Sequence, residues 1–119
     1  MSAKVIEQSN ETFAKLLFRL IDEKNMTDLE VYKAANVGRK IFSDIRHGKI
    51  PEKKTVIKII FALKLSLDEA CSLLERAGYA LSLSLDMDLI VAHFIAEKNF
   101  DNFALDESLS QNNLPKIFY

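Results

Sequence analysis

A short stretch of the chain combines basic side chains with two short apolar runs. Residues 36–54 read NVGRKIFSDIRHGKIPEKK. Arginine and lysine donate hydrogen bonds to phosphate oxygens and to the O6 and N7 atoms of guanine, and serine pairs with several bases. An apolar side chain such as Ile41 can contact the methyl group of thymine. The residue types in this stretch therefore favour contact with a polyanion.

The positive charge of the chain is concentrated around this stretch. The 119 residues carry a formal net charge of −1. Residues 33–58 hold eight basic and two acidic side chains, a local charge of +6, which leaves −7 for the rest of the chain. A charge run is most often a solvated helical face, and it indicates a polyanion contact only when a suitable scaffold presents it. The elements around the stretch therefore decide between the two interpretations.

Composition predicts one globular domain spanning residues 1–119. The chain is 49% hydrophobic and 28% charged, with only three glycines and two prolines, which argues against disorder and against a turn-rich β architecture. Cys71 is the single cysteine, so an internal disulfide and a cysteine-based metal cluster are excluded. No apolar run approaches the roughly 20 residues that span a bilayer. Without a secretory signal, the lone thiol favours a cytoplasmic protein with no membrane contact.

The sequence offers little for catalysis. It contains no Ser–His–Asp order, no glycine-rich phosphate loop and no metal-ligand spacing. His93 is interpreted as a packed or half-exposed helix residue, and Cys71 as a small hydrophobe packed beside an apolar face. Asp86 and Asp88 are interpreted as acids at a helix start. We therefore expect no enzyme activity, no cofactor and no metal.

Apolar spacing and capping signals predict helices along the chain. Phe13, Leu16 and Leu20 begin a stripe that predicts a first helix over residues 11–24. TDLE at 27–30 and SLDE at 66–69 are capping boxes that open a second and a fifth helix. Asn36 is expected to end the second helix in the left-handed conformation, and Gly48 and Gly78 to end the third and fifth.

The remaining elements follow from the same signals. A third helix is expected over 38–47 and a fourth after Pro51. ALSLSL at 80–85 is interpreted as an extended connector whose leucines pack on the helices. Two further helices are expected, one starting near Asp86 and one after Asp101.

Two short helices joined by a tight turn and bracketed by amphipathic helices form a helix-turn-helix arrangement. Residues 27–70, TDLEVYKAANVGRKIFSDIRHGKIPEKKTVIKIIFALKLSLDEA, resemble the five-helix, lambda-repressor-like DNA-binding domain of the Xre type. The resemblance covers roughly residues 11–77. Its matching positions are Val31, Ala34, Ala35, Val37, Phe42, Ser43, Ile45, Gly48, Pro51, Thr55, Leu63 and the LSLDE segment at 65–69.

The resemblance implies an all-α fold of five helices followed by about two C-terminal helices. Asn36 stands where glycine is common in the family turn, and asparagine tolerates the same backbone conformation. Residues 78–119 lie outside the common domain and resemble an extension on some small Xre-type modules of bacteria and phages. The helix at about 38–47 is the recognition helix of the family.

The resemblance also implies two sets of site residues. With Phe42 and Ile45 facing inward, the base-contacting candidates are Arg39, Lys40, Ile41, Ser43, Asp44 and His47. The phosphate-contacting candidates are Lys33, Arg46, Lys49, Lys53, Lys54 and Lys58. Asp44 could accept from cytosine N4, discourage a phosphate or pair with Lys40, and His47 could simply cap the helix C-terminus.

The resemblance predicts a sequence-specific DNA-binding transcriptional regulator with double-stranded DNA as its partner. The alternative is a protein-interaction module, an inhibitor or adaptor on the same scaffold that binds no DNA. Residues 65–119 support this alternative, because their three basic and nine acidic side chains give a charge of −6 and the tail is apolar. The acidic C-terminal half would then bind the protein partner.

A homodimer is also expected, because one short recognition helix reads few base pairs and such proteins pair on half-sites about one helical turn apart. Eight C-terminal apolar residues have no evident place in a five-helix core. They are Leu81, Leu83, Leu85, Leu109, Leu114, Ile117, Phe118 and Tyr119. They would form the dimer interface or, alternatively, cover the protein's own core.

Overall fold

The computed structural model describes residues 11–119, and this part of the chain is all-α, with seven helices and no strand. The helices are α2 (Phe13–Glu23), α3 (Asp28–Ala34), α4 (Arg39–Arg46), α5 (Lys53–Leu63), α6 (Leu67–Arg76), α7 (Asp86–Ala96) and α8 (Asn102–Gln111). The predicted all-α class is confirmed. No helix in the described range is long and apolar enough to cross a membrane.

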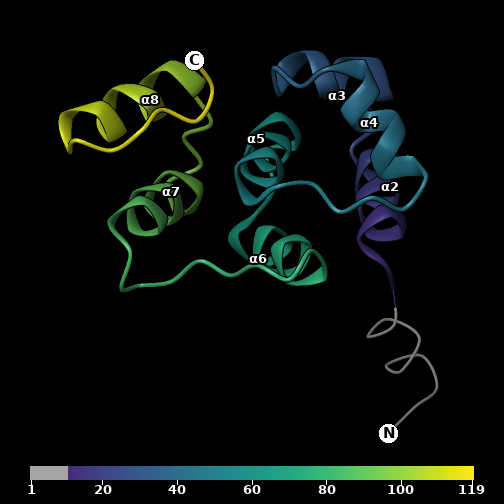
Figure 1. The fold of residues 1–119 in the computed structure, drawn as a ribbon, viewed down its shortest axis with the longest axis horizontal. Helices are drawn as coiled ribbons and strands as arrows, with labels where there is room; N and C mark the ends of the chain where they lie inside the picture. Colours follow the sequence, from purple (N-terminus) through teal and green to yellow (C-terminus); the bar gives the residue numbers. More distant parts are fainter. Residues whose placement is uncertain (1–10) are drawn as a thin grey trace, which may run out of the picture.

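Helix α5 lies at the centre of the molecule. Figure 1 shows it between α2, α3 and α4 on one side and α7 and α8 on the other, with α6 next to it. Six of its eleven residues are buried, more than one face of a helix can supply. One continuous cluster of buried side chains runs from Phe13 in α2 to Phe118 in the tail. The C-terminal helices therefore share a core with the first five helices.

The predicted capping signals are confirmed at α3 and α6. The Thr27 hydroxyl accepts from the Glu30 amide, and the Glu30 carboxylate accepts from the Thr27 amide at 2.9 Å. Ser66 and Glu69 repeat this reciprocal pair at the start of α6. Each box satisfies two amides that have no partner within the helix, so the local sequence fixes where both helices begin.

Asn36 adopts the left-handed conformation expected of it. Its φ angle is 55°, which ends α3 sharply and turns the chain toward α4. Asparagine reaches this region at a lower cost than most residues because its short polar side chain can form local hydrogen bonds. Here the side chain also has a distant partner, since its Nδ2 donates to the carbonyl oxygen of Phe118 at 2.9 Å. The turn is therefore tied to the C-terminal tail.

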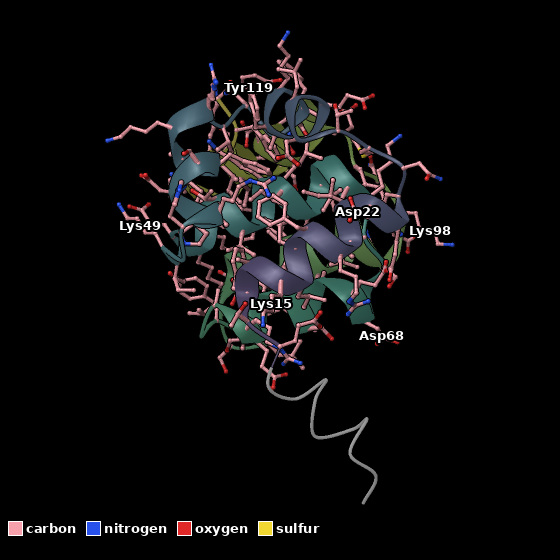
Figure 2. All side chains as sticks on the ribbon, turned by 90° about the vertical axis from the view of Figure 1, so that its right-hand side faces the viewer. Lys15, Asp22, Lys49, Asp68, Lys98 and Tyr119 are labelled. Carbon is pink, nitrogen blue, oxygen red and sulfur yellow. The ribbon has the colours of Figure 1, made fainter. Side chains whose placement is uncertain are left out.

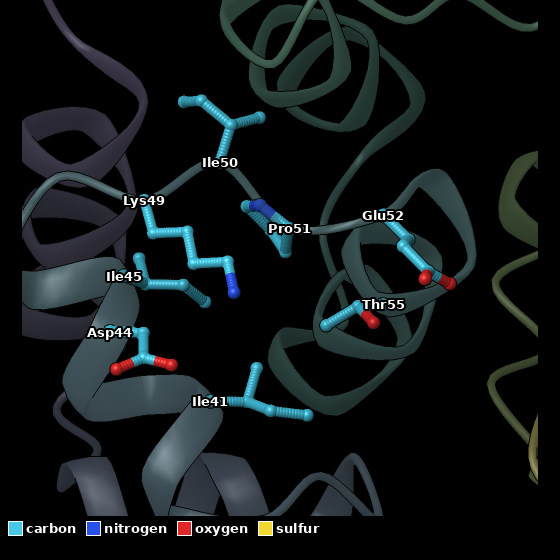
Figure 3. A pocket seen from close by; sticks show the side chains of 8 residues that line it. All are labelled: Ile41, Asp44, Ile45, Lys49, Ile50, Pro51, Glu52 and Thr55. Carbon is cyan, nitrogen blue, oxygen red and sulfur yellow. The ribbon is translucent and has the colours of Figure 1, made fainter.

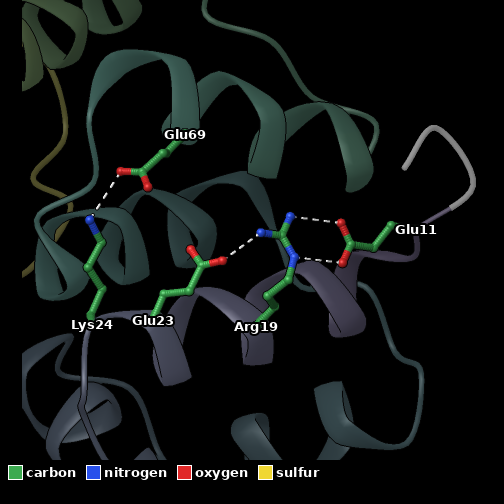
Figure 4. A network of polar contacts seen from close by, with 5 residues as sticks. All are labelled: Glu11, Arg19, Glu23, Lys24 and Glu69. Atoms are coloured by element: carbon green, nitrogen blue, oxygen red, sulfur yellow. Dashed lines mark hydrogen bonds and ion pairs between the residues drawn. The ribbon is translucent and has the colours of Figure 1, made fainter. Parts of the chain in front are cut away.

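Surface ion pairs join α2 to the residue Glu11 before it and to α6 (Figure 4). The Arg19 guanidinium donates to Glu11 at 3.0 Å and to Glu23 at 2.8 Å, and Lys24 contacts Glu69 at 3.2 Å. The hydrogen bond from Arg19 lowers the pKa of Glu11. The Ser66 amide, followed by Lys24, lowers the pKa of Glu69. Ion pairs this exposed contribute about 0–1 kcal/mol each, so they position α2 more than they stabilise it.

Two buried carboxylates hold the C-terminal part of the fold. Asp88 is 2% exposed and accepts from the Lys53 ammonium and from the Ser82 amide, both at 2.8 Å. It thereby links the start of α5, the connector and α7. Asp106 is 3% exposed and accepts from the backbone amides of residues 117–119 at 2.7–3.2 Å. Buried charges need such partners, and these two have them.

The eight residues predicted to form the dimer interface differ in their burial. Leu109, Ile117 and Phe118 are buried in the protein's own core, where the Phe118 ring lies 5.7 Å from that of Phe61. For these three residues the alternative interpretation holds, and the predicted dimer contact is replaced by a role in the core. Leu81 and Leu114 are partly buried against it. Leu83, Leu85 and Tyr119 are exposed, so the expectation that all the connector leucines pack on the helices is wrong.

Candidate nucleic-acid interface

Helix α4 is anchored to the fold by two apolar side chains. Phe42 and Ile45 are 3% and 1% exposed, as their spacing predicts. The Phe42 ring lies 5.8 Å from the rings of both Phe18 in α2 and Tyr32 in α3. In the turn that precedes α4, the buried Val37 donates its amide to the Tyr32 carbonyl at 2.9 Å. These contacts fix the rotation of α4 about its axis and hence which side chains face outward.

The outward face of α4 brings together the predicted base-contacting residues. Five of the six are exposed and Asp44 is half-buried. Gly38 precedes the helix without a side-chain cap, and the first turn carries Arg39 and Lys40 and no acid. Cations at a helix N-terminus oppose the macrodipole, so this end of α4 is less stable alone than with an anion against it. His47 also caps the other end, with Nδ1 2.8 Å from the Ser43 carbonyl oxygen, while its ring stays exposed.

Two of the six predicted phosphate-contacting side chains already have partners inside the fold. Arg46 pairs with Asp28, and its guanidinium carbon lies 4.0 Å from the centroid of the Phe18 ring. Lys53 is held by the buried Asp88. Both contacts join separate helices. Lys53 is held by a buried partner and is therefore less available to a ligand, whereas the Arg46–Asp28 pair is exposed.

The other four predicted phosphate-contacting side chains remain available. Lys33, Lys49 and Lys54 are exposed and Lys58 is half-buried. None of them forms an ion pair within residues 11–119. Figure 2 shows Lys49 projecting from the surface on the side of the molecule that carries α2 and α4. With Arg39 and Lys40, these four side chains form a group of available cations on α4 and the elements next to it.

Helix α4 stands between two surface hollows. A pocket of about 260 Å³ separates it from the loop and the start of α5, and Ile41, Asp44, Lys49, Ile50 and Thr55 contribute to its lining (Figure 3). A second hollow of about 420 Å³ lies between α3 and α4. The helix thus forms a ridge, and a protruding helix is the shape that enters a major groove about 12 Å wide.

Sequence reasoning missed two features beside this ridge. Ile50 is 47% exposed although it precedes a buried proline. An apolar residue type does not by itself predict such exposure. The Arg46–Asp28 pair was also missed, because residues 18 apart in the chain have no periodic relation. Cys71 is exposed and not packed as expected, and partial desolvation of its thiol, followed by the negative charges of Asp68 and Glu75, raises its pKa. Within residues 11–119 no group of His, Cys, Asp and Glu could hold a metal ion.

Comparisons of the chain with models of protein families, with curated proteins and with solved structures find no match. The functional interpretation therefore rests on the geometry and charge of the site itself.

Proposed function

We propose that the protein is a sequence-specific DNA-binding regulator of transcription that inserts α4 into the major groove, in the manner of the lambda-repressor-like, Xre-type domains that its sequence resembles. The observation that carries this proposal is the two-sided character of α4. Its inward face is locked by Phe42 and Ile45, and its outward face presents Arg39, Lys40 and Ser43. These outward side chains donate to base edges and phosphates.

The helix starts support the same function. Helices α4 and α5 begin with adjacent cations, Arg39–Lys40 and Lys53–Lys54, and neither has an acid in its first turn. Helices α3, α6 and α7 carry acids there, as the macrodipole favours. Of these two starts, that of α4 lacks compensation within the fold, because α5 has Glu52 at its N-cap and its Lys53 is held by Asp88. A phosphate beside the start of α4 would offset the cost there.

Replacing Arg39 and replacing Lys54 should have different effects on DNA binding. Arg39 lies at the exposed start of α4, the end that contacts base edges in helix-turn-helix proteins. Arg39→Ala should weaken binding by about 1–3 kcal/mol and relax the preference at one or two base positions. Lys54→Ala should weaken all sequences alike and reduce the salt slope by about 0.9, the value for one lost phosphate contact.

The measurement is a binding titration at several salt concentrations on duplexes selected from a random pool. Leu67→Ala, an exposed substitution on α6, is the control and should bind as the unaltered protein does. If Arg39→Ala keeps the sequence preference of the unaltered protein, α4 is not the helix that contacts the base edges. The proposed function would be refuted if micromolar protein failed to shift random duplex DNA at low salt.

The expected homodimer has its own supporting observation, an exposed aromatic pair at the C-terminal end of the fold. Phe103 on α8 and Tyr119 in the tail are 70% and 72% exposed, and their ring centroids lie 6.5 Å apart. Exposed aromatic pairs of this kind mark interaction sites more often than isolated apolar residues do. We assign the pair to a homodimer contact, for which the exposed Leu83 and Leu85 are also available.

Substitution of both aromatic residues tests the dimer. Phe103→Ser combined with Tyr119→Ser should convert a dimer into a monomer in sedimentation at tens of micromolar protein, because the contact would lose its apolar centre. Leu67→Ser, which alters exposed apolar surface elsewhere, should leave the dimer intact. An unaltered protein that sediments as a strict monomer would exclude this contact.

A further inference from the structure

The pocket between α4 and the start of α5, here called the α4–α5 pocket, has a composition that suits one particular base. Ile41, Asp44, Lys49 and Ile50 line it. We propose that the α4–α5 pocket recognises 5-methylcytosine paired with guanine in duplex DNA. This inference rests on the proposed DNA-binding function and adds the base that the site prefers.

The pocket places a carboxylate beside aliphatic side chains. Ile41 and Asp44 are three residues apart on α4, so their Cβ atoms share one face at a separation of about 5–6 Å. Ile50 contributes to the lining from the loop that follows, on the opposite side of the pocket from Ile41 (Figure 3). Ile41 and Ile50 are 43% and 47% exposed, which leaves apolar surface available at the mouth of the pocket. An acceptor and an apolar contact can therefore meet the same base edge.

The carboxylate of Asp44 is available to accept a hydrogen bond from a ligand. It is half-buried, and its side chain forms no hydrogen bond or ion pair within residues 11–119, so the predicted alternative of a pair with Lys40 is not realised. A carboxylate on a DNA-facing helix repels phosphates unless a base donor offsets the repulsion. In the major groove the donors are the N4 amino group of cytosine and the N6 amino group of adenine.

The aliphatic side chains decide between these two donors. The apolar group that bases present in the major groove is a methyl on C5 of a pyrimidine. In 5-methylcytosine this methyl is adjacent to the N4 donor. In an adenine–thymine pair the methyl is adjacent to the O4 acceptor of thymine, which the Asp44 carboxylate would repel. A methyl directly beside a donor is therefore the arrangement that 5-methylcytosine offers and thymine does not.

Lys49 completes the match with the opposite base. Its side chain reaches into the centre of the pocket in Figure 3. Guanine presents the O6 and N7 acceptors next to the N4 donor of its paired cytosine. The pocket thus supplies an aliphatic contact, an acceptor and a cationic donor, which correspond to the methyl, the N4 donor and the guanine acceptors. Glu52, which also lines the pocket, is exposed and lies on the loop side, away from α4.

Parallel selections test this inference with the full chain. One random duplex pool is synthesised with cytosine and the other with 5-methylcytosine, and the bound sequences are recovered from each. Duplexes carrying cytosine, 5-methylcytosine or thymine at each selected pyrimidine are then titrated. We expect one position at which 5-methylcytosine binds about fourfold more tightly than cytosine, the factor for withdrawing one methyl group from water. The duplex with thymine at that position should bind at least about fivefold more weakly than the duplex with cytosine.

Three variants assign the preference to the pocket. Ile41→Ala and Ile50→Ala should abolish the advantage of the methyl group and retain the preference for cytosine over thymine. Asp44→Asn should lose that second preference, because an amide can donate to O4 of thymine as well as accept from N4 of cytosine. All three positions are at least partly exposed, so unchanged thermal unfolding shows that the variants are folded.

The outcomes separate this inference from the proposed function. Sequence-specific binding with equal or weaker affinity for 5-methylcytosine would overturn the inference and leave DNA binding standing. A methyl preference that persists in both isoleucine variants would also overturn it, because another surface would then contact the methyl group. Absence of binding to either pool at micromolar protein would overturn both.

Discussion

Replacing Phe42 with alanine is expected to lower the free energy of unfolding by about 3–5 kcal/mol, a large part of the stability of a domain of this size. The ring is 3% exposed and lies edge-on to Phe18 at 5.8 Å, with Tyr32 at the same distance. The substitution would open a cavity where α2, α3 and α4 meet. Chemical denaturation monitored by circular dichroism measures the loss.

Phe42→Leu is the matched control for this prediction. Leucine retains most of the buried apolar volume, so its cost should be well below that of alanine. Any loss of DNA binding in the alanine variant would follow from unfolding. Arg39→Ala should not lower the midpoint of unfolding, because Arg39 is exposed and opposes the macrodipole of α4. A Phe42→Ala protein with unaltered stability would show that the opposite face of α4 packs inward.

Replacing Asp106 with alanine is expected to cost about 3–6 kcal/mol and to release the tail. The carboxylate accepts from the amides of Ile117, Phe118 and Tyr119, and all of these bonds are lost in the variant. An unpaired buried amide costs about 1–3 kcal/mol, so the tail would detach to rehydrate its amides. Detachment exposes Ile117 and Phe118. The burial of each side chain contributes about 1.5–3 kcal/mol to the free energy of unfolding, and the loss of both contributions gives the expected cost.

Hydrogen exchange distinguishes tail release from general destabilisation. The amides of residues 117–119 should lose protection in Asp106→Ala, while those in the centre of α5 should change only in proportion to global stability. Glu107→Ala is the matched control, because Glu107 is the adjacent acid on α8 but is exposed. Full protection of the tail amides in Asp106→Ala would show that apolar packing alone holds the tail.

The release of the tail should also affect the turn between α3 and α4. Asn36, in the turn before α4, donates to the Phe118 carbonyl, and Asn102 donates to the Ala34 carbonyl at 3.2 Å. Both contacts connect the C-terminal segment to the end of α3. The extension thus supports the element that positions α4, which gives the C-terminal helices a physical role independent of any partner.

Local sequence determined where most helices begin and end and which face of each turns inward. The capping boxes at Thr27 and Ser66, the left-handed Asn36 and the buried Phe42 and Ile45 were all predicted, and the structure shows each of them. These features depend on residues within about four positions of one another. Helical periodicity and terminal hydrogen bonds act over that range, so composition and spacing suffice to find them.

Tertiary structure alone decided which charged and apolar residues are free to meet a ligand. Lys53 and Lys54 are adjacent in the chain and equivalent in charge, yet Lys53 is held by Asp88, 35 residues away, and Lys54 is exposed. Likewise, Ile117 and Phe118 are buried, whereas Tyr119 is exposed. Periodicity indicates that a side chain faces inward, but its partner depends on how distant helices pack. The final shape of the basic surface was therefore fixed by the long-range contacts around α5, α7 and the tail.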